Sequence, residues 1–237
     1  MISIMLRDMR WRMLIVSLLS VFLYFLEPAF HQHGPTEPGF DAELGPLGVS
    51  AALAYLAGLS MIVLLTGFVA SDVREGYTAI HFSHPTSPLA YYGLRWLLAL
   101  TVALGATVMF LLLGQVIAWG EVRGGGAGIL LGLLAALIYG GLMAFFSTLL
   151  RSGDGWVVFI LFLPTPVPQI LTWIEALLPE SLYQIVLFLL PPQNALQEVY
   201  RGLLLGDIAW PAVAFAGGYG MFWLVLAALL LRTRERF

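Results

Sequence analysis

Few residues of this chain could carry out chemistry, and most of them lie between long apolar stretches. All eleven basic residues are arginine, so the chain lacks the lysine with which a nucleotide-binding P-loop reaches the phosphates. There is no cysteine, which excludes disulfides and thiolate metal ligands. His31 and His33 form a His-x-His pair, but two loop histidines without a third ligand favour a solvated pair over a metal site. We therefore predict no metal site, no bound cofactor and no enzymatic activity in this chain.

Charged residues are also scarce inside the apolar stretches. Among the acidic residues, only Glu175 could lie within one of them, close to its outer end. A proton-coupled carrier would bury carboxylates or histidines near the middle of the membrane. An intramembrane serine protease would need a histidine there, whereas all four histidines fall between the stretches. The pattern favours a membrane-spanning protein whose activity is powered by a separate component.

The composition predicts an all-α integral membrane protein with a single domain over residues 1–237. Hydrophobic residues make up 60% of the chain, charged residues 11%, and the mean hydropathy is +0.90. A soluble domain carries about 25% charged residues. At roughly 20 residues per crossing, the chain accommodates six transmembrane helices in a lipid bilayer. The net charge of −3 argues against nucleic acid as a partner.

The apolar stretches give the expected positions of the crossings. Five of them lie at 11–26, 49–70, 89–119, 129–150 and 208–231, and another begins at Trp156. Residues 1–12 carry apolar side chains on one helical face and arginines on the other, which predicts an N-terminal interfacial helix. Small residues recur at every fourth position of the fourth crossing, which favours close helix packing within the subunit. They are Gly128, Gly132, Ala136 and Gly140.

The arginines fall mainly in alternate segments between the crossings. If the N-terminus lies inside, the outside segments hold only Arg123 and Arg201. The inside segments hold Arg7, Arg10, Arg12, Arg74, Arg95, Arg151, Arg232, Arg234 and Arg236. Because a basic excess in short loops marks the cytoplasmic face, we predict a protein of the cytoplasmic (inner) membrane with both termini cytoplasmic. Segments 27–47 and 175–207 are then outside.

Two proline clusters interrupt the second half of the chain. Pro164, Pro166 and Pro168 break the fifth crossing, because each removes a backbone donor. This break is either a functional discontinuity or a kink packed by protein. Pro191 and Pro192 separate two apolar pieces, 181–190 and 193–205, that are too short to span alone.

We expect these pieces to form a re-entrant outside hairpin. Glu198 and Arg201 lie on one helical face of the second piece and can pair there. The hairpin would either cap the outer end of a substrate path or only pack the helices.

The inside segment 71–88 carries the clearest candidate contact site. Asp72 can cap a short helix whose first turn holds Glu75. Ile80 and Phe82 are apolar residues on the cytoplasmic face, and an exposed apolar patch ringed by charge marks a contact surface. Alternatively, the segment is an interfacial loop whose apolar residues dip into lipid.

Several of these features together resemble the type-2 ABC exporter permeases. Such permeases have six crossings, an amphipathic N-terminal helix, a coupling helix between crossings two and three, and an outside re-entrant hairpin before the last crossing. The matching stretches are Glu75-Gly76-Tyr77, Phe82-Ser83-His84-Pro85, Ser87-Pro88 and the run from Pro192 to Gly202. Tyr77 stands where the family usually has threonine. The broken fifth helix and small size also resemble the haem-exporter permease of cytochrome c maturation.

The resemblance implies the membrane-spanning subunit of an ATP-driven exporter. ATP and Mg would be bound by separate ABC ATPase subunits, and a second copy or a homologous permease would complete a homo- or heterodimer. The residues implied in coupling to the ATPase are Asp72, Arg74, Glu75, Gly76, Tyr77, Ile80 and Phe82. A different class remains open, namely a non-transporting membrane anchor or regulatory subunit of a membrane complex.

The predicted topology can be checked with single cysteines, because the native chain has none. A cysteine in place of Gly39 should react with a membrane-impermeant maleimide in intact cells, since segment 27–47 is expected outside. A cysteine in place of Ser83 should react only after the membrane is permeabilised. The opposite pattern would reverse the orientation.

Overall fold

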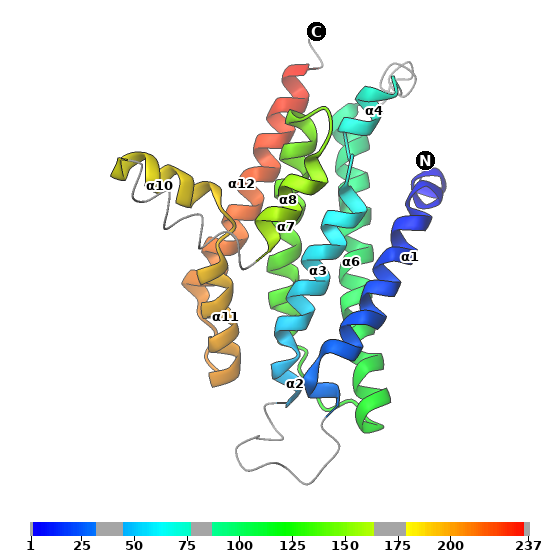
Figure 1. Cartoon of the computed structure of the whole chain (residues 1–237), viewed down its shortest axis with the longest axis vertical. Helices are drawn as coiled ribbons and strands as arrows, with labels where there is room; N and C mark the ends of the chain where they lie inside the picture. The colour runs from blue at the N-terminus through cyan, green and yellow to red at the C-terminus, as the bar shows by residue number, and fades with distance from the viewer. Residues whose placement is uncertain (1, 32–44, 77–86, 164–178, 235–237) are drawn as a thin grey trace.

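The computed structural model of the chain is a helical bundle (Figure 1) that describes residues 2–31, 45–76, 87–163 and 179–234. No β-strand occurs in these ranges. The helices are α1 (Ile2–Leu26), the 3₁₀ turn η1 (Pro28–Phe30), α2 (Gly45–Gly48), α3 (Ser50–Leu65), α4 (Ala70–Arg74), α6 (Pro88–Trp119), α7 (Gly128–Leu149), α8 (Asp154–Phe162), α10 (Glu180–Leu189), α11 (Gln193–Leu205) and α12 (Trp210–Arg234). The start of α1, α4 and the end of α12 lie toward one end of the bundle, here named the α4 end, and α2 lies toward the other.

Five helices of the described chain are long and apolar enough to cross a membrane, which is the architecture of a multi-pass membrane protein. Their candidate spans are Met9–Leu26, Ser50–Arg74, Pro88–Trp119, Gly128–Leu149 and Trp210–Thr233. The expected fifth crossing begins as α8, but α8 is only nine residues long and its continuation lies outside the described residues. The total of six crossings therefore stays a prediction.

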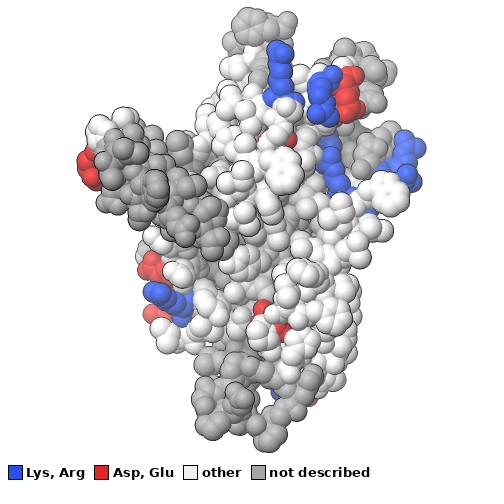
Figure 2. Space-filling view, viewed as in Figure 1, with Lys and Arg blue, Asp and Glu red and all other residues white. Residues whose placement is uncertain are grey.

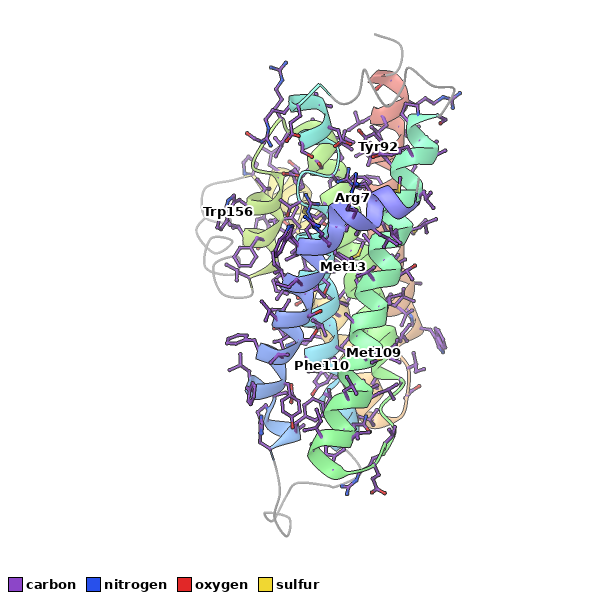
Figure 3. All side chains as sticks on the ribbon, turned by 90° about the vertical axis from the view of Figure 1, so that its right-hand side faces the viewer. Arg7, Met13, Tyr92, Met109, Phe110 and Trp156 are labelled. Carbon is purple, nitrogen blue, oxygen red and sulfur yellow. The ribbon has the colours of Figure 1, made fainter. Side chains whose placement is uncertain are left out.

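The N-terminal helix differs from the expectation in one respect. The expected interfacial helix over residues 1–12 and the first crossing form one continuous helix, α1, with no break at residue 12. The physical reason is that the sequence has neither proline nor glycine between Ile2 and Leu26, so nothing interrupts the backbone hydrogen bonds. The first turns of α1 nevertheless run across the long axis of the bundle before the helix turns to follow it (Figures 1 and 3).

The centre of the bundle is formed by α3 and α7, which are the most deeply buried of the spans. The small residues of α7 point into the subunit, as the four-residue spacing predicts. A Cβ atom added at Gly132 would meet the side chain of Thr107 at 3.2 Å, and one at Gly140 would meet Met61 and Trp96. Because lipid gives helices no hydrophobic reason to associate, such close approach supplies the packing contacts that hold them together.

The outward faces of the bundle are apolar. Figure 2 shows a surface that is mostly uncharged over its middle height, with basic side chains gathered toward the α4 end. Large hydrophobic side chains are exposed there on α1, α6 and α12. They include Leu18, Phe22, Leu113, Ile117, Phe222 and Val225. In a soluble protein so much exposed apolar area would drive association, whereas in a bilayer it contacts acyl chains.

A cap closes the bundle at the end opposite α4. Phe30 of η1 is completely buried and packs against Phe110 and Trp119 of α6. The carboxylate of Glu27 accepts a hydrogen bond from the backbone N–H of Ala29 at 3.3 Å, which caps η1. Burial raises the pKa of Glu27, and the opposing effects of this hydrogen bond and of the nearby His31 are smaller.

The close approach of α7 and α12 provides a test of the fold. A Cβ atom at Gly220 of α12 would lie 2.6 Å from the backbone of Leu137 in α7, which cannot move without shifting the helix. Gly220→Ala should therefore lower the free energy of unfolding by about 1–3 kcal/mol, the usual cost of overpacking. Gly218→Ala is the matched control on the same helix, since nothing lies within 4 Å of its Cβ position. Equal melting temperatures of the two variants in detergent would refute this packing.

Candidate functional site

The segment implied in coupling begins as a short helix at the end of α3. A turn at residues 66–69, in which Gly67 takes a φ of +68°, redirects the chain after Leu65. Such a positive φ is easily adopted only by glycine. The turn leads directly into α4, whose C-terminal residues Val73, Arg74 and Glu75 are exposed. Gly76 ends the helix with a φ of +74°.

Asp72 does not cap this helix, contrary to the sequence-based expectation. The residue at the helix N-cap is Val69, without a side-chain cap, and Glu75 lies at the C-cap instead of in the first turn. The reason is that α4 starts at Ala70, three residues earlier than a helix capped by Asp72 would, which turns Asp72 toward the bundle. The carboxylate of Asp72 accepts hydrogen bonds from Arg95 and from the hydroxyl of Tyr92, each to Oδ2 at 3.2 Å.

The pair of Asp72 and Arg95 is buried, with exposed fractions of 8% and 9%. The same Nη1 atom of Arg95 also donates to the backbone carbonyl of Phe68 at 3.0 Å. Arg95 was expected among the arginines of the inside segments, but it lies two turns into α6. Buried charges need a close counter-charge and further hydrogen bonds to offset their desolvation, and Asp72, Tyr92 and Phe68 supply them here. The interaction ties α4 to α6.

Two further polar contacts tie the turn between α3 and α4 to its other neighbours. The hydroxyl of Ser147, near the end of α7, accepts hydrogen bonds from the backbone N–H groups of Val69 and Ala70 at 2.9 and 3.2 Å. The carboxylate of Asp154, at the start of α8, accepts from the N–H of Gly67 at 2.9 Å. Together with the ion pair, these bonds fix the turn and α4 against α6, α7 and α8.

The exposed residues at the C-terminal end of α4 are available to a partner protein. Val73, Arg74 and Glu75 are here called the α4 tip. Arg74 and Glu75 form an exposed ion pair at 3.5 Å, and the side chain of Val73 is 42% exposed. Tyr77, Ile80 and Phe82, the other residues expected in coupling, lie outside the described residues. The helix break at Pro164, Pro166 and Pro168 lies outside them as well.

Two short helices, α10 and α11, occupy the part of the chain where the outside hairpin is expected, and its re-entrant geometry stays a prediction. Pro191 and Pro192 separate α10 from α11, as their sequence predicts. Helix α11 packs beside α12, and α10 extends away from the bundle (Figure 1). Glu198 and Arg201 are both exposed on α11 and form no ion pair with each other, although their spacing allows one. An exposed pair gains too little to hold two long side chains in one geometry.

A contact that the sequence did not reveal joins the start of α11 to the centre of the bundle. The side-chain amide of Gln193 donates a hydrogen bond to the hydroxyl of Tyr139 at 2.6 Å. The ring of Tyr139 also packs edge-on against Phe162, the last residue of α8, with ring centroids 4.9 Å apart. The end of α8 and the start of α11 therefore meet at one tyrosine of α7.

A cavity of about 780 Å³ opens at this meeting point. Its lining combines aromatic side chains with the amides that follow Pro192, and none of the described residues that line it is charged. The aromatic rings come from Tyr55, Tyr139, Phe162, Phe188, Tyr200, Phe215 and Tyr219. Such a lining suits an uncharged molecule that is partly apolar and partly able to form hydrogen bonds.

Comparisons with known proteins give no further identification. No protein-family model matches the chain, and no curated protein matches it.

Asp72 of the buried ion pair and Glu75 of the exposed one lie three residues apart, so the stability effects of substituting them can be compared directly. Asp72→Ala leaves the Arg95 guanidinium buried without its carboxylate, so it should lower the free energy of unfolding by about 3–5 kcal/mol. Glu75→Ala removes only an exposed partner and should cost less than about 1 kcal/mol. Thermal unfolding in detergent measures both. Similar losses of stability in the two variants would contradict the conclusion that Asp72 holds α4 against α6.

Proposed function

We propose that the chain is the permease subunit of a type-2 ABC exporter that moves substrate across the cytoplasmic membrane. The observation that carries the proposal is the way α4 is held. Its exposed tip is free to meet a partner, while the turn behind it is bonded to α6, α7 and α8 through Arg95, Ser147 and Asp154. A surface helix fixed to three other helices at once is suited to pass on a force.

The proposed mechanism is a rigid-body movement. ATP binding in a separate ATPase would close that partner and displace the α4 tip. Because the turn behind the tip is bonded to several helices, they would move with it as one unit. The absence of lysine supports a separate ATPase, since this chain has no P-loop of its own.

The uncharged cavity beside Tyr139 is the proposed contact point for substrate. It lies where α8 ends and α11 begins, and irregular backbone within a membrane protein is tolerated where it is packed by protein or lines a cavity. A second copy of the chain, or a homologous permease, would complete the path from the other side. The expected re-entrant geometry of α10 and α11 belongs to the same proposal.

Purification from the native membrane tests the proposal most directly. A tagged chain should bring down a P-loop ATPase, and the complex should hydrolyse ATP whereas the isolated chain should not. The alternative, a non-transporting anchor or regulatory subunit, predicts co-purification of a membrane complex without such an ATPase. Nucleotide hydrolysis by the rigorously purified chain alone would refute the assignment.

The α4 tip can be tested by substitution. Glu75→Ala combined with Phe82→Ala should reduce both recovery of the ATPase and substrate-stimulated hydrolysis, without preventing membrane insertion, because both residues precede the third crossing. The control is Arg123→Ala, which removes an exposed charge at the opposite end of the bundle. Normal association and transport in the double variant would return the segment to a lipid-facing loop.

A further inference from the structure

A second cavity, of about 1000 Å³, forms a groove at the α4 end. Its lining residues come from α1 and α8, here called its two walls, and from the end of α3, from α4 and from the start of α6. Figure 3 shows Arg7 and Trp156, one from each wall, at a similar height. Figure 2 shows basic side chains gathered toward this end of the bundle.

Each described carboxylate that lines the groove has a partner within the protein. Asp72 is paired with Arg95, Asp154 accepts the N–H of Gly67, and Glu75 pairs with Arg74. Their negative charges are therefore already compensated, or held by a backbone donor, within the protein.

Two arginines of α1 add positive charge to this lining. Arg7 is exposed and forms no ion pair with any described residue. Arg12 reaches across to α3, where its Nη1 donates to the carbonyl of Leu64 at 2.7 Å, and so stands in the groove with a fixed orientation. A guanidinium presents several N–H donors in one plane and matches the oxygens of a phosphate.

The groove also has an apolar part. Ile62, Val63 and Phe159 line it, and Trp156 is 73% exposed at its edge. Arg7 lies just before the apolar span of α1, which begins at Met9. Basic side chains thus stand at the level where the apolar surface starts, and tryptophan is typical of that boundary. A soluble anion would use the arginines but would leave this apolar wall uncovered.

We propose that the groove binds an anionic phospholipid, with its phosphate at Arg7 and Arg12 and its acyl chains along Phe159 and Trp156. Basic pockets between transmembrane helices at the cytoplasmic side recognise such headgroups, and the arginine distribution predicts that the α4 end is cytoplasmic. The lipid would bridge α1 and α8, which both pack against α3 in the described part of the chain. The proposal does not depend on a transport function.

The test compares phosphatidylglycerol with phosphatidylcholine on the purified full chain, by native mass spectrometry in detergent. Wild type should bind phosphatidylglycerol in preference. Arg7→Gln should weaken this binding about fivefold, the factor that corresponds to about 1 kcal/mol for one basic residue at an anionic surface. The matched control is Arg232→Gln, which removes an exposed arginine near the end of α12 that does not line the groove. It should leave binding unchanged.

A second readout locates the lipid. Brominated phosphatidylglycerol should quench the fluorescence component that disappears in Trp156→Phe, more strongly than brominated phosphatidylcholine does. Equal loss of binding in Arg7→Gln and Arg232→Gln would show that only diffuse surface charge attracts the lipid, and would overturn the proposal. So would inorganic phosphate binding that depends on Arg7 without any preference for phosphatidylglycerol, because the arginines would then serve a soluble phosphate.

Discussion

The buried ion pair of Asp72 and Arg95 is the interaction on which the arrangement of the α4 end depends. Two charges removed from water are stable only when each has a close counter-charge and hydrogen bonds for its remaining atoms. Tyr92 and the carbonyl of Phe68 provide these bonds. Any movement of α4 away from α6 would expose or strand one of the charges. The α4 tip, the turn behind it and α6 are therefore expected to move together.

Below this polar end, the bundle is held by close contact between small residues. The backbones of α7 and α12 approach each other at Gly141 and Gly220, where a side chain on either would collide with the other helix. Helix α7 thus joins α3 on one side to α12 on the other. By contrast, only 11% of the α1 span is buried, compared with 67% of the α3 span. The centre is closely packed, whereas α1 lies at the periphery with most of its span exposed.

The two cavities differ in chemistry because they lie at different heights of the bundle. The groove at the α4 end brings together arginines and carboxylates, whose charges are tolerated where a membrane gives way to water. The cavity beside Tyr139 is lined by aromatic rings and amides and holds no charge among its described residues. If the first holds a lipid and the second contacts a substrate, one chain offers separate sites for a regulator of its packing and for its cargo.

The positions of most elements follow from the sequence by itself. The apolar runs predicted crossings at 89–119 and 129–150, and the structure has α6 at Pro88–Trp119 and α7 at Gly128–Leu149. Pro191 and Pro192 likewise mark the gap between α10 and α11. These features are local, because the thickness of a bilayer sets the length of an apolar helix and a proline breaks a helix wherever it stands.

Only the tertiary structure decided which polar residues meet. The sequence predicted Asp72 as a helix cap and Arg95 as one of the arginines of an inside segment, whereas folding buries them together across 23 positions of the chain. The contact between Tyr139 and Gln193 spans 54 positions. Hydropathy and periodicity report how a residue relates to its own helix and to the membrane. Partners on different helices are set by how the helices turn and cross, and these are determined by the packing of the whole bundle.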